Sequence, residues 1–258
     1  MLRTNALAAI METGIHNKLS AVDSIDLDAP IDSDAIFLPA RPVPGRSNKP
    51  PLVPPAQLKK RSVNTTEGRA SLIHALAHIE FNAVDLGLDI VWRFPNMPDP
   101  FYRDWARIAK EEALHFKLLS NHLMNLGYSY GDFPAHNGLW EMAEKTSDDI
   151  LARLALVPRT LEARGLDVTP HIKQKLQNAG DHGAASILDI ILRDEIGHVA
   201  AGNRWYRYVC ERRGLDPVTT YRELAEIYRA PRLRGPYNHT ARRAAGFDET
   251  ELAELDNA

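Results

Sequence analysis

The chain has 258 residues, of which 44% are hydrophobic and 25% are charged, and its formal net charge is −3. This composition is ordinary for a globular protein, and the small negative charge gives no general attraction to nucleic acid or to anionic membranes. The single cysteine, Cys210, excludes an internal disulfide framework. The sequence has no signal-peptide pattern and no run of about eighteen apolar residues, so we expect a cytoplasmic protein that does not enter a membrane.

Residues 1–60 are expected to form an N-terminal extension with a short helix over residues 7–17. Seven prolines between residues 39 and 55 exclude helix there and favour extended chain. This stretch is either a linker or an arm that wraps the rest of the protein, and its apolar residues favour the arm. The expected anchors of the arm are Phe37, Leu38, Leu52 and Val53.

Residues 61–214 are expected to form a four-helix bundle, because apolar residues recur at helical spacing and no alternating strand pattern occurs. Proline or glycine after each long helix indicates where that helix ends. The expected long helices run from Thr65 or Thr66 to Phe94, over 101–126, from Ser147 or Asp148 to Gly165, and over 181–213. Residues 139–145 should form a short helix, and Thr169-Pro170 should open a new helical segment.

The last long helix carries two residues that are wrong for a dry core. Its apolar seam runs through Leu188, Ile191 and Trp205, and it also contains Glu195 and His198. Residues three apart lie on the same face of a helix, and glutamate is almost never fully buried without a partner. A carboxylate and an imidazole that point together into an apolar interior suggest a pair of metal ligands.

The same Glu-x-x-His spacing recurs in the second long helix as Glu112 and His115. Bundles that hold two metals use two such helices, together with one glutamate from each of two other helices. Glu80 and Glu162 occupy inward seam positions on the first and third helices and meet this requirement. Pro158 should kink the third helix one turn before Glu162. The alternative for each glutamate is a buried ion pair with an arginine, for which the candidates are Arg107, Arg159 and Arg193.

Four carboxylates and two imidazoles suit two iron ions, with manganese as the alternative, whereas a soft thiolate site would need cysteines that are absent. His74 and His78 lie on a different face from Glu80, so we expect them to be hydrogen-bonded core residues or to support the ligands from behind. Trp205 is the best placed of the aromatic residues to line a pocket. The others are Tyr128, Tyr130 and Tyr206.

Several segments resemble the ferritin-like di-iron carboxylate superfamily: LAHIEFNAVDL, KEEALHF, PRTLEARGLDVTP and RDEIGHVAAGNRW. The sequence is most similar to the bacterial ferritin-like family of unknown function number 455, and more distantly to the ferritin-like tRNA hydroxylases. The resemblance covers about residues 60 to 250. It implies a ferritin-like four-helix bundle and a metal site, with no assigned substrate. Position by position, it implies as metal ligands and catalytic residues Glu80, Glu112, His115, Glu162, Glu195 and His198.

The first functional hypothesis is a dioxygen-dependent oxygenase or oxidase that attacks a C–H bond of a small or anionic substrate, with an electron donor as a further partner. The alternatives are iron storage or peroxide detoxification, tRNA hydroxylation, and a non-catalytic protein stabilised by metal. Storage needs a cage of many subunits, which the long extensions would obstruct, so we expect a monomer or a dimer. The negative net charge argues against a nucleic-acid partner, whereas local arginines favour one.

Residues 215–258 are expected to form a C-terminal extension with a helix over 218–229. It contains a basic cluster made of Arg229, Arg232, Arg234, His239, Arg242 and Arg243. This cluster is either a solvated or salt-bridged surface tail or an anion-binding lid over the metal pocket, because arginine binds carboxylates and phosphates with two hydrogen bonds.

Overall fold

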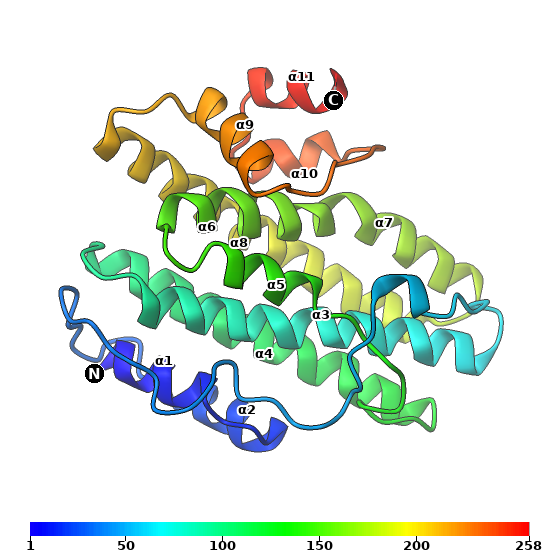
Figure 1. The fold of residues 1–258 in the computed structure, drawn as a ribbon. Helices are drawn as coiled ribbons and strands as arrows, with labels where there is room; N and C mark the ends of the chain where they lie inside the picture. The colour runs from blue at the N-terminus through cyan, green and yellow to red at the C-terminus, as the bar shows by residue number, and fades with distance from the viewer. Residues whose placement is uncertain (258) are drawn as a thin grey trace. The chain divides into compact units, whose positions relative to one another are not determined.

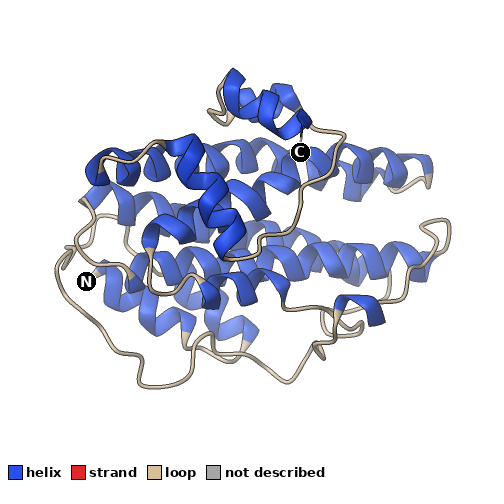
Figure 2. Cartoon of the chain, turned by 45° about the horizontal axis from the view of Figure 1, so that its top comes forward, coloured by secondary structure: helices blue, strands red, loops and turns tan. Residues whose placement is uncertain are grey.

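The computed structural model describes residues 1–257, and the regular elements in this range are all helices (Figures 1 and 2). The all-α class is thereby confirmed. The chain divides into two compact units, Met1–Trp140 and Glu141–Ala258. The predicted division at residues 60 and 214 stays a prediction. None of the described helices combines the length and the apolar character that a bilayer span requires.

The first unit is built on two long helices, α3 (Thr66–Arg93) and α4 (Asp99–Asn125), which lie side by side in Figure 1. Two short helices, α1 (Leu2–Ile10) and α2 (Ile15–Asp23), pack against this pair. The expected single helix over residues 7–17 is wrong because the chain breaks at Gly14, which caps α2 in an extended conformation.

Local signals explain where α3 and α4 begin and end. The Thr65 side chain accepts a hydrogen bond of 3.0 Å from the Gly68 N–H at the start of α3. Gly127 follows α4 with φ +83°, a conformation that glycine adopts without strain. Between the helices, a Cβ on Gly87 would lie 3.0 Å from the Ala109 Cβ and 3.2 Å from the Trp105 carbonyl oxygen. Gly87 therefore permits the close approach of the two backbones.

The proline-rich segment is an arm on the first unit. The Val53 N–H donates to the Ala135 carbonyl at 2.8 Å, and the Gly45 N–H donates to the Ile10 carbonyl at 2.7 Å. The expected apolar anchors are wrong in part, since Leu38 is 84% exposed and Leu52 is 41% exposed. Backbone hydrogen bonds hold the arm instead. Because proline has no N–H, only the non-proline residues of this segment can donate them.

In the second unit, α6 (Ile150–Leu156), a π-helix (Val157–Glu162) and α7 (Ala163–Asn178) follow one another without a break. The long helix α8 (His182–Arg213) comes after a short turn. The short α5 (Gly138–Lys145) spans the division between the units. The Asp181 side chain caps α8 by accepting from the Ala184 N–H at 3.0 Å, and Gly214 ends it with φ +64°. The bounds predicted for this helix are confirmed.

The predicted end of the third long helix at Gly165 is wrong, because α7 continues through Gly165 and through Thr169-Pro170 to Asn178. Proline inside a helix leaves the carbonyl four residues earlier without its N–H donor. Here that carbonyl belongs to Leu166, and it accepts from the Asn238 side-chain amide at 3.2 Å. The N-cap also differs, since Asp149 rather than Ser147 or Asp148 accepts from the Leu151 N–H.

The kink predicted at Pro158 takes the form of the π-helix, whose last residue is Glu162. A wider helical turn accommodates the missing N–H of proline, and such turns recur at functional sites. A Cβ on Gly202 of α8 would lie 2.6 Å from the Pro158 Cβ and 3.0 Å from its Cγ. The proline ring thus rests on the bare backbone of Gly202.

Three short helices complete the second unit: α9 (Pro217–Ile227), α10 (His239–Ala244) and α11 (Glu249–Asn257). Residues of α10 and α11 share a buried cluster with residues of α7 and α8. Its members are Ala163, Leu166, Val199, Ala241, Ala245, Phe247 and Leu252. The C-terminal extension is therefore a packed part of this unit, and it supplies polar contacts to the long helices as well.

Gly202→Ala should lower the free energy of unfolding by about 1–3 kcal/mol, because the new methyl group overlaps Pro158 in a packed core. Gly197→Ala on the same helix is the matched control. Its Cβ meets nothing within 4 Å, so it should raise the free energy of unfolding by up to about 1 kcal/mol. Urea unfolding followed by tryptophan fluorescence measures both. Equal stability of the two variants would contradict the close contact between Gly202 and Pro158.

Candidate metal centre

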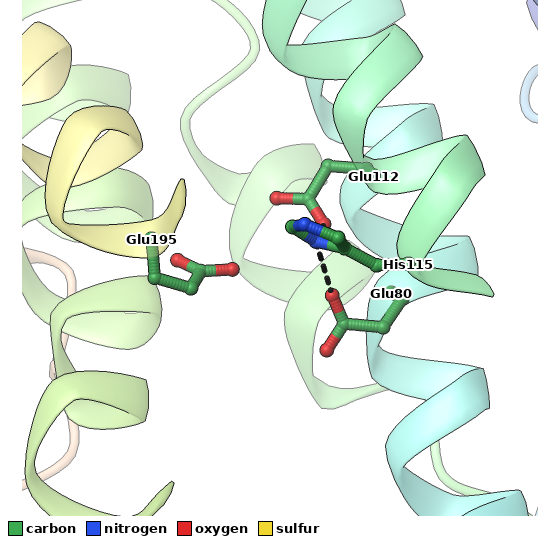
Figure 3. A group of neighbouring side chains, drawn as sticks. All are labelled: Glu80, Glu112, His115 and Glu195. Atoms are coloured by element: carbon green, nitrogen blue, oxygen red, sulfur yellow. Dashed lines mark hydrogen bonds and ion pairs between the residues drawn. The ribbon is translucent and has the colours of Figure 1, made fainter. Parts of the chain in front are cut away.

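The α3–α4 pair brings three of the six predicted ligands together: Glu80, Glu112 and His115. The His115 Nδ1 lies 3.2 Å from the Glu80 Oε2 and 3.3 Å from the Glu112 Oε2. Figure 3 shows these three side chains pointing toward one another, and it also draws Glu195 of α8. Because ionised carboxylates only accept hydrogen bonds, the Nδ1–H of His115 is the donor to both glutamates.

All three side chains are buried, with exposed fractions of 5% for Glu80 and 0% for Glu112 and His115. Burial lowers the pKa of His115, but its hydrogen bonds to Glu112 and Glu80 and their negative charges outweigh burial and raise it to about 11. The raised pKa favours the protonated form of His115, whose positive charge offsets the two carboxylates.

This buried Glu/His cluster could hold a metal ion. Each of the three residues offers a ligand atom, and these atoms lie within 4.8 Å of one another. The donors are carboxylate oxygen and imidazole nitrogen, which suit iron, manganese or zinc rather than a soft metal ion that prefers thiolate ligands. A cation in this position would replace the positive charge that the protonated His115 provides.

The second unit carries the other three predicted ligands, Glu162, Glu195 and His198. Glu195 and His198 are buried on α8 with exposed fractions of 8% and 1%, and the His198 Nδ1 lies 3.7 Å from the Glu195 Oε1. Glu162 is half-buried at the end of the π-helix. The spacing correctly predicted one shared face for Glu195 and His198. The assignment of all six residues to a single centre stays a prediction.

The arginines considered as alternative partners have other contacts. Arg107 lies 3.4 Å from Asp104, Arg159 pairs with Glu251, and Arg193 pairs with Asp194 at 2.8 Å. In the part of the chain that the structure describes, neither Arg107 nor Arg159 therefore forms an ion pair with any of the six predicted ligands. The Arg159–Glu251 pair could not be predicted locally, since 92 residues separate the two side chains.

His74 and His78 are hydrogen-bonded core histidines, which is the first of the two roles predicted for them. The Gly131 N–H donates to the His74 Nε2 at 2.9 Å. The His78 Nε2 lies 3.1 Å from the His136 carbonyl, and its Nδ1 lies 2.7 Å from the Tyr130 hydroxyl. Since a carbonyl only accepts, Nε2 of His78 carries the proton and Nδ1 accepts from Tyr130. Burial lowers the pKa of each histidine to about 4.

The other aromatic candidates are mainly packing residues. Trp205 makes an edge contact with Tyr208 at 5.4 Å between ring centroids, and the Tyr206 hydroxyl donates to the Pro217 carbonyl at 2.7 Å. Tyr128 packs against Phe133. The hydrogen bond from Tyr130 to His78 was not anticipated, and a loop tyrosine 52 residues from its partner gives no periodic signal.

The family model described as "Protein of unknown function (DUF455)" matches residues 5–253 of this chain. A Haemophilus influenzae protein described as "Uncharacterized protein" is 52% identical over 211 residues, which cover 79% of this chain and 73% of that protein. No solved structure matches the chain.

His74 should make the protein sensitive to mild acid. Its pKa is about 4 in the folded chain and about 6.5 when unfolded, so the unfolded state binds more protons between these values and stability falls as pH falls through this window. The slope from one such histidine reaches about 1.4 kcal/mol per pH unit. His74→Phe keeps the ring contacts but cannot titrate. In this variant the free energy of unfolding, measured with urea at several pH values between 6.5 and 5, should therefore fall less steeply with pH than in the wild type. An unchanged slope would show that His74 is not held neutral.

Proposed function

Since this chain belongs to the family described as protein of unknown function (DUF455), whose description names no activity, we propose a function from its own side chains. It is a two-metal carboxylate protein, with iron as the metal and manganese as the alternative, that uses dioxygen to oxidise a small organic substrate. One observation carries this proposal: Glu80, Glu112 and His115 are buried together on the paired helices α3 and α4.

In this proposal, the Glu162, Glu195 and His198 side chains of the second unit complete the ligand set. Burial supports it, because Glu195 and His198 repeat the spacing of Glu112 and His115 on an inward face. Four carboxylates carry a charge of about −4, which two divalent cations cancel. Burying such charges without compensation is too costly to occur in a stable core.

The residues of the first unit fit a metal ion in a specific way. Bound iron would supply reversible one-electron chemistry and a site for dioxygen to react. A histidine binds a metal through neutral imidazole, so His115 must give up the proton that it donates to Glu80 and Glu112. The released proton would pass to solvent, and the metal ion would then compensate the two carboxylates in its place.

The aromatic residues next to these ligands in the sequence help to keep the α3–α4 interface dry. Phe81 follows Glu80, Phe116 follows His115, and their ring centroids lie 5.0 Å apart. Tyr130 packs edge-on against Phe116 at 5.0 Å. Phe81 and Phe116 are buried, so water has little access to this stretch of the two helices. A dry surrounding strengthens the electrostatic interactions on which metal binding depends.

A second candidate is a non-catalytic protein that metal stabilises. The observation in its favour is the same cluster, because a cation that compensates buried carboxylates contributes folding energy whether or not it reacts. The two candidates differ only in dioxygen chemistry, so metal binding and dioxygen uptake have to be measured separately.

Glu112→Ala, His115→Ala, Glu195→Ala and His198→Ala should each lower the bound metal from two ions per chain to one or fewer, because each removes a ligand atom. His78→Ala is the control and should leave the stoichiometry nearly unchanged, since His78 bonds to Tyr130 and to the His136 carbonyl. Metal analysis of protein loaded with ferrous iron under argon gives the numbers.

Equal metal loss in all five variants would show that the ligand faces are assigned wrongly. Loss confined to the α4 variants would restrict the centre to the first unit. Circular dichroism of each variant before loading separates a missing ligand from a failure to fold.

Anaerobically loaded wild-type protein should take up dioxygen on exposure to air, with a new near-ultraviolet absorption, faster than the same concentration of ferrous iron in buffer. His115→Ala should reduce this uptake to the buffer rate, because one metal position loses its imidazole. An oxygen electrode and an optical spectrum record both changes. Two bound metals without dioxygen uptake above the buffer rate would reject the oxidase and support the metal-stabilised protein.

A further inference from the structure

The second unit contains a cavity of about 770 Å³ between its C-terminal elements. Residues of α9, α10 and α11 line it, together with residues 229–233 of the loop between α9 and α10 and Arg159 of the π-helix. This volume is typical of sites for small organic ligands. None of the six proposed metal ligands is among the lining residues, so the cavity is a separate feature of the chain.

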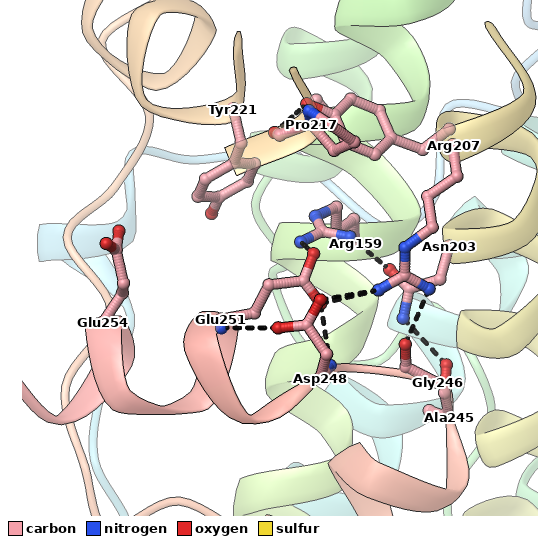
Figure 4. Close-up of polar contacts among 12 residues, drawn as sticks. Arg159, Asn203, Arg207, Pro217, Tyr221, Ala245, Gly246, Asp248, Glu251 and Glu254 are labelled. Atoms are coloured by element: carbon pink, nitrogen blue, oxygen red, sulfur yellow. Dashed lines mark hydrogen bonds and ion pairs between the residues drawn. The ribbon is translucent and has the colours of Figure 1, made fainter. Parts of the chain in front are cut away.

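Two buried arginines form a fixed part of the cavity wall. Arg159 donates to the Asn203 Oδ1 at 2.9 Å and to Glu251 (Figure 4). Its guanidinium lies 4.9 Å from the ring centroid of Phe247. Arg242 bonds to Asp167 through two nitrogens, at 3.0 and 2.7 Å. These carboxylates neutralise the two arginines, yet the Arg159 Nε and the Arg242 Nη1 are buried N–H donors with no acceptor among the described residues. Buried donors normally have an acceptor.

The rim of the cavity carries arginines of a different kind. Arg229 and Arg232 are exposed and line the cavity, and neither has an ion pair or a side-chain hydrogen bond to any side chain described in residues 1–256. Arg222, by contrast, pairs with Glu254. Glu226 is the one remaining carboxylate of the lining residues. Two cations against one anion leave an excess positive charge, so the rim favours an anionic group.

The loop that carries this rim is held in place at several points. The Asn238 N–H donates to the Asp167 Oδ1 at 2.9 Å, and Arg164 donates to the Arg234 carbonyl at 2.5 Å. Arg229 adopts φ +52° as the left-handed residue that follows α9, where the Ala230 N–H donates to the Ala225 carbonyl at 2.8 Å and closes the helix end.

The remaining lining residues are apolar and include Val218, Leu233, Phe247 and Leu255. Apolar walls would contribute little to the binding of a free phosphate or another small inorganic ion, but they would cover the body of an organic acid. Arginine binds a carboxylate with two parallel hydrogen bonds. The cavity therefore combines the two features needed to bind an amphiphilic anion, which are a cationic rim and apolar walls.

We propose that this cavity binds a small organic acid, with its carboxylate at Arg229 and Arg232 and its apolar body against Leu233, Phe247 and Leu255. For Arg229 and Arg232 this favours an anion site, though not one over the metal pocket, whereas the salt bridges of Arg242 and Arg243 agree with the surface-tail alternative. It also restricts the site to two of the arginines. Arg242 and Arg243 are committed to Asp167 and Glu249. The proposal does not depend on a metal or on dioxygen chemistry.

Isothermal titration calorimetry of the full chain with sodium octanoate tests the site. Wild-type protein should bind one octanoate, whereas octan-1-ol and inorganic phosphate should each bind at least tenfold more weakly, because each lacks one half of the recognition. The double variant R229Q/R232Q should raise the octanoate Kd at least tenfold. Ala225→Trp, which fills the cavity without changing its charge, should abolish binding.

R234Q is the matched control, since Arg234 lies in the same loop and does not line the cavity. It should change the octanoate Kd less than twofold, and circular dichroism should show every variant folded. His115→Ala should bind octanoate as the wild type does, which separates this site from the metal centre. Equal weakening in R234Q, phosphate binding as tight as octanoate, or no difference between octanoate and octan-1-ol would each overturn the proposal.

Discussion

The structure depends on how the first unit compensates negative charge inside an apolar helix pair. Glu80 and Glu112 lie at the α3–α4 interface, and the imidazolium of His115 donates to both. Without this cation, two carboxylates in a dry interface would repel each other and lose their hydration. A metal ion held by these three side chains would supply the same positive charge. The contact therefore links the compensation of two buried carboxylates to the capacity of this cluster to hold a cation.

Signals within a few residues predicted the parts of the fold that depend on them. Thr65 and Asp181 cap their helices through their own side chains, and Gly127 and Gly214 end the preceding helices with positive φ. The Glu-x-x-His spacing placed both members of each pair on one face, because helix geometry fixes this directly. Spacing does not fix a rotamer, so the sequence could not show that one nitrogen of His115 serves two carboxylates.

Several failures of prediction have a partner far away in the chain as their cause. A new helical segment should have opened at Thr169-Pro170 after a helix end at Gly165, but α7 runs through both, and Asn238 satisfies the carbonyl of Leu166 from 72 residues away. The arm should have been anchored by its apolar side chains, but backbone hydrogen bonds to Ile10 and Ala135 hold it. A distant partner also decides the alternative raised for the glutamates, since Arg159 pairs with Glu251 and not with a predicted ligand. Local propensity is overruled wherever tertiary contacts supply the missing donor or charge.

The π-helix of the second unit shows why the packed C-terminal extension matters for the proposed ligands. A π-turn is a poor helical geometry that persists only when its surroundings favour it. Here Pro158 rests on Gly202, Arg159 is held by Asn203 and Glu251, and the Thr160 hydroxyl bonds to the Ala155 carbonyl at 2.8 Å and to the Tyr221 hydroxyl at 2.9 Å. Tyr221 and Glu251 come from α9 and α11, so the extension fixes the segment that ends at Glu162.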